Sequence, residues 1–430
     1  MLKRIFYIFL LLISIKTFGQ RSNSSPYSFF GIGQQYGSQS EEQATMGGVG
    51  VAFSSLYRIN FINPASFANL KLATYSIGLN VNDLTVKDNS GSQKSTSTSV
   101  SYLNIGFPIG KNTGLAFGLK PNTTVGYSLL NVVNDSNGDP FEATRFYGSG
   151  GTNKIYGAFG ISVSKSFDVG FEAEYIFGNT ENNILSQKTG VQLATKSNEV
   201  TTIRGTGLKL GVLYKNELKN KLLVNIGAAI KLENKLTTNG SEYLYSTSIV
   251  SGGFDSPRDT TYRATVNGEI INPLKTILGV GIGKLNKWNA SLDYEFQNAL
   301  NVKGSLLTSN SSYQFGKSSR VSVGGFYIPK INSIASYWDR VTYRAGVRFE
   351  DTGLLVNGAN AGFTKIKDFG ISFGLGLPLR DLSNLNLGVE YGKKGSTINN
   401  LIQENYFNFK LSLSLNAIGN LAWFQKRKID

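Results

Sequence analysis

Acidic and basic side chains at short, regular spacing are the residues of this 430-residue chain that could carry out chemistry. FEAEYIF and SLDYEFQ each place two carboxylates two residues apart, and WDRVTYRAGVRFED places arginines four residues apart. Paired carboxylates can act as acid and base on a glycosidic bond, and arginines can bind an anionic headgroup. The candidate residues are Glu172, Glu174, Asp293, Glu295, Arg340, Arg344 and Arg348.

Composition excludes several other chemistries. The chain has no histidine and no cysteine, so a Ser-His-Asp triad, a Cys-His pair and a zinc site built from those residues cannot form. The segment DSNGD (135–139) offers oxygen ligands for Ca²⁺, although a plain loop turn accounts for the same residues. We therefore expect no enzyme activity, no cofactor and no metal.

A glycine cluster in MGGVGVAFSSLYRINFINPASF raises the question of phosphate binding. Glycine-rich loops bind phosphate where they follow a strand and open a helix, because backbone N–H groups then converge on the anion. Here Gly47, Gly48 and Gly50 match neither G-x-G-x-x-G nor a Walker loop, and Asn63-Pro64 follows without an amphipathic helix. We expect these glycines to allow close backbone packing instead.

Alternation of apolar and polar residues predicts β-strands throughout the chain. In YFNFKLSLSLNAI, Phe and Leu alternate with Asn, Lys and Ser, which is the period of a strand with one apolar face. We expect 14 strands, near 71–82, 97–109, 114–128, 145–164, 168–178, 198–214, 222–234, 262–284, 287–299, 311–328, 338–350, 367–379, 385–393 and 406–418.

The length of the connections differs between the two ends of these strands. Connections after even-numbered strands are mostly short, such as GKNT and KLNK. Outer-membrane barrels have short periplasmic turns, long extracellular loops and an even number of strands. The long polar connections expected here follow odd-numbered strands, at 83–96, 129–144, 179–197 and 235–261.

Proline positions support the same arrangement. Pro108, Pro329 and Pro378 each fall next to a short turn, where a missing N–H donor costs least. The predicted fold is therefore all-β, a 14-stranded antiparallel transmembrane outer-membrane barrel over residues 71–418. A soluble β-protein is the alternative, but it has no reason to place its long loops at one end.

Inside such a barrel the candidate charges share the inward face of their strands. Glu172 and Glu174 alternate with Phe171 and Tyr175, which would then face lipid. A barrel interior is polar, so these charges either pair with one another or form a girdle that receives a ligand headgroup. Nothing else in the chain suggests a sugar cleft for glycosidase chemistry.

The first residues have the layout of an export signal. MLKRIFYIFLLLISIKTFGQ has two early cations, an apolar run too short to span a bilayer and a small residue at Gly19, so we expect cleavage after about residue 19. The formal charge is +15 and the mean hydropathy −0.12. A basic exported protein meets anionic lipid, so we expect outer-membrane lipid and lipopolysaccharide as surroundings and no nucleic acid.

The ends of the chain resemble a known family. SPYSFFGIGQ (25–34), ATMGGVGVAF (44–53) and NFINPASF (60–67) resemble the FadL-like outer-membrane proteins, and more closely a divergent branch that includes the type IX secretion shuttle PorV. The resemblance implies an N-terminal hatch inside the barrel, here residues 20–70, containing Gly47, Gly48, Gly50, Asn63 and Pro64. NLAWFQKRKID (420–430) is similar to that branch's aromatic and basic tail, which we expect over 419–430 in the periplasm, although the chain does not end on an aromatic residue.

The third expected strand contains a break. Pro121 falls in its middle and removes a ladder donor, while Asn122 and Gly126 could support a bulge or a bend. In FadL-like barrels an inward kink of this strand opens a side gap for apolar ligands, so the resemblance implies such a gap between Pro121 and Gly126. A plain bulge is the alternative.

Function is inferred chiefly from the resemblance. It implies passive transport of a hydrophobic or amphipathic small molecule across the outer membrane. The alternative is a non-transporting barrel that serves as a subunit of a larger outer-membrane secretion or barrel-assembly complex, as PorV does. A lumen filled by the hatch and by side chains would favour the alternative.

Overall fold

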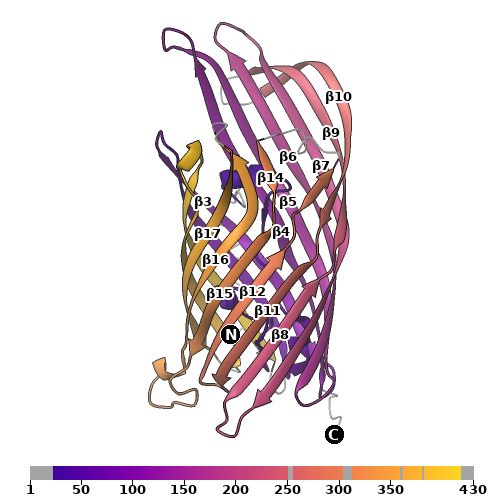
Figure 1. Cartoon of the computed structure of the whole chain (residues 1–430), viewed down its shortest axis with the longest axis vertical. Helices are drawn as coiled ribbons and strands as arrows, with labels where there is room; N and C mark the ends of the chain where they lie inside the picture. The colour runs from indigo at the N-terminus through magenta and orange to yellow at the C-terminus, as the bar shows by residue number, and fades with distance from the viewer. Residues whose placement is uncertain (1–22, 250–254, 304–311, 359–361, 380–381, 418–430) are drawn as a thin grey trace, which may run out of the picture.

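The alternating segments pair into one antiparallel sheet that closes on itself. Each strand pairs with the next along the chain, and β19 (Gln403–Ala417) closes the barrel against β2 (Ala73–Lys87), with Ala417 opposite Ala73. A computed structural model shows this closed barrel standing upright (Figure 1). It describes residues 23–249, 255–303, 312–358, 362–379 and 382–417. The expected signal sequence and basic tail lie outside these residues.

Fourteen transmembrane strands make the wall, as the sequence predicts. Four of them consist of two consecutive elements, because a short interruption divides the strand while both parts pair with the same neighbouring strand. These are β8 (Leu223–Lys231) with β9 (Asn234–Ile249), β10 (Asp255–Asn272) with β11 (Lys275–Lys284), β12 (Trp288–Gln297) with β13 (Asn301–Lys303), and β14 (Tyr313–Phe315) with β15 (Ser318–Tyr327). The others are β2, β3 (Ser92–Pro108), β4 (Thr113–Asn134), β5 (Pro140–Ser162), β6 (Phe167–Lys188), β7 (Ala194–Glu217), β16 (Thr342–Asn357), β17 (Phe363–Pro378), β18 (Asn384–Gly395) and β19.

Outward-facing side chains give the barrel an apolar surface. Along β6, exposed Phe171 and Tyr175 alternate with buried Glu172 and Glu174. Exposed apolar residues likewise alternate with inward polar residues or glycines in β11, β12, β17 and β19. An apolar exterior around a polar interior is the arrangement that a lipid bilayer requires of a barrel.

The long connections expected at one end are instead strands. The segments 129–144, 179–197 and 235–261 were expected as polar loops, but β4, β5, β6, β7, β9 and β10 extend through most of them. Of 83–96, only residues 88–91 lie outside β2 and β3. Beyond the membrane both faces of a strand can contact water, so the alternation that reveals a lipid-facing strand disappears. These strands form hairpins that rise above the rest of the barrel on one side, which we call the tall rim (Figure 1).

Helical elements are few and short. η1 (Pro26–Phe29), α2 (Glu41–Ala44) and η2 (Pro64–Asn69) precede the barrel, and η4 (Trp338–Arg340) and η6 (Ile398–Asn400) lie in connections. Within the described ranges, no helix has the length and apolar character needed to cross a membrane.

Candidate functional site

The N-terminal segment, residues 23–72, lies in the barrel lumen. Nearly all residues between Ser40 and Ala52 are buried, and the segment makes hydrogen bonds to strands around the barrel. α2 is held by a capping box, in which Ser40 and Gln43 each accept a hydrogen bond from the other's backbone N–H. The segment therefore carries its own local order into the lumen.

The glycine cluster holds a carboxylate of the barrel wall. The backbone N–H groups of Gly50 and Val51 both donate to Oδ2 of Asp293 on β12, at 2.7 and 2.9 Å. Gly47 has φ of 70° and Gly48 has φ of 85°, a left-handed conformation that other residues rarely adopt. The cluster thus binds an anion through converging N–H groups, but that anion is the protein's own side chain.

Glycines on the inner wall make room for the segment. A Cβ built on Gly324 or Gly346 would overlap the backbone of Met46, and one built on Gly374 would overlap Thr45. Such glycines occur on most strands, so the segment contacts the wall backbone around most of the circumference. These wall glycines are Gly114, Gly126, Gly160, Gly170, Gly211, Gly227, Gly279, Gly324, Gly346, Gly374 and Gly388.

Asn63 and Pro64 fix the end of the segment before it enters the wall. The side-chain amide of Asn63 donates to the carbonyls of Val51 at 2.7 Å and Val212 at 2.9 Å, and its oxygen accepts from the N–H of Ala65 at 3.0 Å. Pro64 begins η2, where a missing N–H costs nothing. Asn63 thus joins the glycine cluster, η2 and strand β7.

The start of the segment is anchored near the tall rim. Ser25 donates to the Glu404 carboxylate and Tyr27 donates to the Ile402 carbonyl, both on or next to β19. Burial, followed by the nearby Glu404 carboxylate, raises the pKa of the Tyr27 phenol, so it remains a neutral donor. Phe29 packs edge-on against Tyr127 of β4, with ring centroids 5.2 Å apart.

Arg344 pairs with the segment rather than with the carboxylates of other strands. Its guanidinium contacts Oε2 of Glu42 at 3.2 Å, and Arg58 contacts the same oxygen at 3.4 Å. Oε1 of Glu42 accepts from the amide of Asn386 at 3.0 Å. The carboxylate of the neighbouring residue, Glu41, pairs with Lys410 of β19 at 3.4 Å. Both acids of α2 are therefore neutralised by the wall.

Glu172 and Glu174 face the lumen and pair with lysines of adjacent strands. Lys209 contacts Glu172 at 2.8 Å and also donates to the Phe61 carbonyl of the segment at 2.9 Å. Glu174 pairs with Lys154 at 2.7 Å and with Lys231. All these side chains are at least four-fifths buried.

Glu295 and Arg348 form the centres of two further ion-pair groups. Glu295 contacts Lys275 at 2.8 Å and Arg320 at 2.6 Å. Arg348 contacts three carboxylates at 2.9 to 3.1 Å, and Lys410 extends that group at 3.5 Å from Glu390. The three carboxylates are those of Glu350, Asp368 and Glu390.

Arg340 does not join the lumen charges. The sequence places it on the inward face of an expected strand, but β16 begins only at Thr342. Arg340 is exposed at the end of η4, where its guanidinium lies 5.3 Å from the Tyr337 ring centroid, while Val341 is fully buried. A backbone turn has no two-residue period, so the alternation that places Arg344 and Arg348 does not extend to Arg340.

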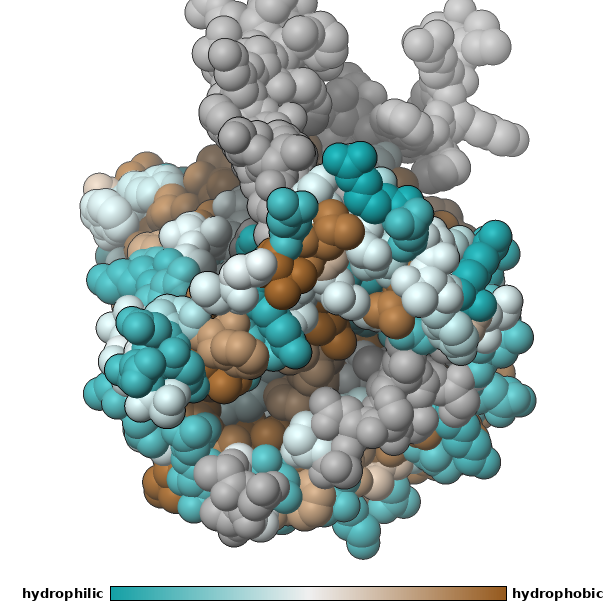
Figure 2. Space-filling view, turned by 90° about the horizontal axis from the view of Figure 1, so that it is seen from above, coloured by the Kyte–Doolittle hydropathy of each residue, from teal (hydrophilic) through white to brown (hydrophobic). Residues whose placement is uncertain are grey.

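A polar cavity of about 310 Å³ remains between the segment and the wall. Charged side chains of both signs line it, together with Tyr36 and Gln39 of the segment. Seen from above, the tall-rim end of the barrel is hollowed (Figure 2). The charged residues of the cavity include Lys275, Glu295, Arg320, Arg348, Glu390 and Lys410. Each of the six belongs to one of the ion-pair groups above.

Sequence reasoning missed the cations that complete these groups. Lys154, Lys209 and Lys275 lie on inward positions of their strands, so the same alternation would have found them. Lys120 on β4 was also missed. It is buried, its Nζ lies 4.8 Å from the Phe61 ring centroid and donates to the Ser38 carbonyl at 3.3 Å, and it forms no ion pair with a carboxylate among the described residues. The register between consecutive strands places the first three lysines beside their partners.

β3 and β4 separate at the break around Pro121. Their pairing runs only from Pro108 opposite Gly114 to Leu103 opposite Leu119, and we call the separation beyond it the strand split. On its other side β4 stays paired with β5, with a register shift between Pro121 and Thr123.

The N-terminal segment bridges the strand split from inside. β1 (Gln34–Gln35) pairs with Thr124 and Thr123 of β4. The N–H of Tyr36 donates to the Asn122 carbonyl at 2.9 Å, and the N–H of Gly126 donates to Oγ of Ser28 at 3.0 Å. Whether a ligand passes at Pro121, Asn122 and Gly126 stays a prediction.

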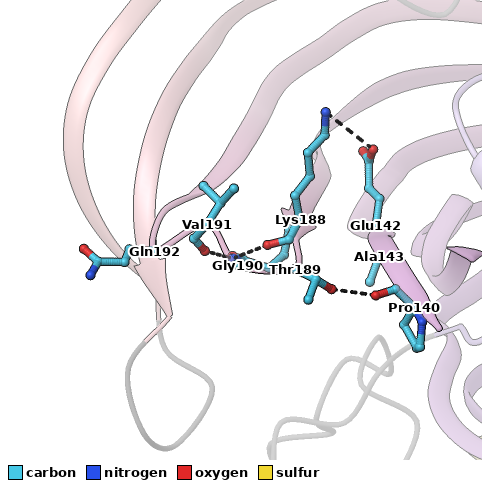
Figure 3. A pocket seen from close by; sticks show the side chains of 9 residues that line it. Pro140, Glu142, Ala143, Lys188, Thr189, Gly190, Val191 and Gln192 are labelled. Atoms are coloured by element: carbon cyan, nitrogen blue, oxygen red, sulfur yellow. Dashed lines mark hydrogen bonds and ion pairs between the residues drawn. The ribbon is translucent and has the colours of Figure 1, made fainter. Parts of the chain in front are cut away.

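A second, more open pocket lies on the tall rim. It measures about 470 Å³, and Figure 3 shows Lys188 pointing toward Glu142 and Thr189 toward the Pro140 carbonyl. The Lys188–Glu142 separation is 3.9 Å, and the Lys188 side chain is 55% exposed. Nearby, in DSNGD, Oδ1 of Asp135 accepts from the N–H groups of Asn137 and Asp139, as in a loop turn. These are surface turns without a buried charged group.

Solved structures with the same fold are FadL-type channels. The CymD monoaromatic hydrocarbon channel aligns with a TM-score of 0.55 at 14% identity, covering 90% of this chain and 98% of that one. A FadL homologue from Pseudomonas aeruginosa aligns with a TM-score of 0.58 at 13% identity, covering 89% of this chain and 98% of that one. The toluene transporter TodX from Pseudomonas putida aligns with a TM-score of 0.56 at 16% identity, covering 89% of this chain and 97% of that one. They confirm the expected FadL-like fold.

Comparison by sequence identifies the family. A search of curated proteins finds none that matches. The family model named BamG matches residues 1–430, the whole length of the chain. This chain, an outer-membrane-type barrel, therefore belongs to the BamG family.

Proposed function

We propose that this chain is a non-transporting barrel subunit of an outer-membrane secretion or barrel-assembly complex. In this role the barrel holds the protein in the membrane, and the N-terminal segment acts as a fixed plug. The tall rim faces outward, as the longer connections of outer-membrane barrels do, and is available to partner proteins. The complex, rather than this barrel alone, carries out the chemistry or transport.

The observation that carries this proposal is the contact between the N-terminal segment and the wall glycines. A segment that moves aside for a ligand needs space or a weakly held contact. Here the backbones of Met46 and Val51 lie directly against the wall, and protein interiors packed this closely do not deform continuously. Asp293 and Arg344 add buried polar contacts that displacement would leave unpaired.

The lumen chemistry also supports a closed barrel. An apolar ligand entering the 310 Å³ cavity would take water away from the ion-pair groups around Glu295 and Arg348. Removing water from charged groups is unfavourable unless new polar contacts replace it, and a hydrocarbon offers none.

A second candidate function is passive transport of hydrophobic or amphipathic small molecules. The strand split at Pro121 favours it, as does the fold shared with channels described as carrying toluene and other monoaromatic hydrocarbons. Pro121→Val restores a backbone donor at the split. If the split carries transport, this variant should slow uptake of a radiolabelled monoaromatic compound by intact cells; unchanged uptake speaks against transport there.

Purification from the native membrane in a mild detergent tests the first proposal. We expect large partner proteins to co-purify in stoichiometric amounts, and the full chain to remain electrically silent in planar bilayers. A chain that purifies alone and conducts, or that accelerates apolar uptake when reconstituted, would overturn the subunit role.

A further inference from the structure

The part of β4 beyond the strand split has one free edge. Residues 127–134 of β4 pair with β5 through Pro140 to Gly148, but β3 no longer lies beside them. Within the described part of the chain, no backbone hydrogen bond satisfies that edge beyond Gly126. Unpaired strand edges offer a row of N–H and C=O groups to any strand that can approach.

The composition of this edge is unlike that of a protected one. Natural proteins shield free edges with charged residues, proline or short strands. The β4 segment YSLLNVVN (127–134) contains no charge and no proline, and it is strongly apolar. Leu130 is 68% exposed, Val132 45% and Val133 49%. In an isolated molecule such an edge would promote aggregation, so its composition indicates that a partner covers it.

The backbone orientation identifies the residues that face the free edge. The Asn122 carbonyl and the Gly126 N–H both bond to the N-terminal segment, on the side that β3 has left. N–H and C=O groups of alternate residues in a strand point the same way. Ser128, Leu130 and Val132 therefore direct their backbone groups to the free edge, and the residues between them bond to β5.

This edge already accepts a strand lower down. β1 occupies the place of β3 beside Thr123 and Thr124, but it is only two residues long. Resting on the proposed role as a complex subunit, we propose that a β-strand of a second protein adds to the β4 edge over residues 127–134. Main-chain hydrogen bonds supply the binding energy in this mode, and side-chain contacts supply the selectivity.

The chemistry of the edge describes the partner strand. It needs about eight extended residues to match 127–134 and apolar side chains at alternate positions to cover Leu130 and Val132. The outward apolar residues Phe117 and Leu119 precede the strand split, and no side chain of β4 from residue 120 to residue 127 is exposed. We place the edge at 127–134, beyond that interruption, outside the bilayer. The partner is therefore a protein present at the tall-rim side of the membrane.

Photo-cross-linking in intact cells tests the register of this contact. A photoreactive phenylalanine analogue placed singly at 128, 130 and 132 should link to one partner segment, with the linked site moving by two residues for each step along β4. The same analogue placed at Phe141 should not give this stepwise shift of the linked site, because its strand β5 is paired on both sides, with β4 and β6. Cross-links only to lipid, to a second copy of this chain or to scattered partner sites would overturn the proposal.

Charges placed on the edge provide the second test. L130K with V132K should reduce the co-purified partner at least tenfold, whereas Phe141→Lys should leave its amount unchanged. Both variants must retain the heat-dependent gel shift of a folded barrel. If the partner co-purifies undiminished with the lysine variant, strand addition is wrong while the subunit role stands. If no partner co-purifies with the unaltered chain, the subunit role itself fails.

Discussion

Glycine at the wall positions reflects the absence of space for a side chain. Gly346 has no room for a Cβ, because Met46 and Gly47 lie directly against it. We expect Gly346→Val to lower the free energy of unfolding by about 1–3 kcal/mol, the usual cost of overpacking. The free energy of unfolding is measured by titration with urea, with the gel shift of the folded barrel as the signal. Gly91→Val is the control, since a Cβ at Gly91 meets no atom within 4 Å; equal destabilisation of both variants would contradict the close fit.

The contact between Glu42 and Arg344 should be worth more than a surface ion pair. Both groups are buried, and Arg344→Met leaves Glu42 with Arg58 alone among its cations. Breaking one partner of a buried pair typically costs about 3–5 kcal/mol. Glu42→Gln should recover part of that loss in the double variant. Removing the exposed cation of the Lys365–Asp351 pair should cost under about 1 kcal/mol.

Strand alternation predicted the inward orientation of the candidate charges, while their role in ligand binding stays a prediction. Glu172, Glu174 and Glu295 face inward because each lies between outward apolar neighbours. Their partners could not be assigned, because pairing depends on the register between neighbouring strands. Arg340 failed because the strand starts later than the pattern suggests.

At the scale of elements, we expect the N-terminal segment to decide whether the lumen conducts. Deleting residues 35–60 removes α2, the glycine cluster and Arg58 from the lumen while leaving every barrel strand. We expect this variant to open stable pores in planar bilayers, whereas the full chain stays closed. A deletion variant that shows the folded gel shift yet conducts no current would contradict the plug.

Element boundaries were predictable in the membrane and not beyond it. Lipid imposes one apolar face on each strand, so the 14 segments stand out. The tall rim faces water on both sides, and segments such as 179–197 then resemble loops in composition although ladder hydrogen bonds hold β6 and β7 together. The strand split was foreshadowed by Pro121, but its bridging by β1 depends on a contact between residues about 90 positions apart.

For the whole molecule, we expect closure to resist salt. Exposed ion pairs weaken as ionic strength rises, but buried pairs are screened much less. Conductance of the full chain measured from 0.1 to 1 M KCl should therefore show no opening. A current that appears abruptly at high salt, beyond what bulk conductivity explains, would mean that the ion pairs alone keep the plug in place.

The fit between the N-terminal segment and the wall glycines also sets an order of events. The segment contacts strands from β4 to β19, so its binding site is complete only when nearly the whole sheet has formed. Yet a closed wall that leaves no space for a side chain offers no path for late entry. The chain must therefore curl around its own beginning, and the β2–β19 seam, which joins the first and last strands, should close last. Any factor that delays this seam would give the segment time to settle, whereas premature closure would trap an empty and leaky barrel.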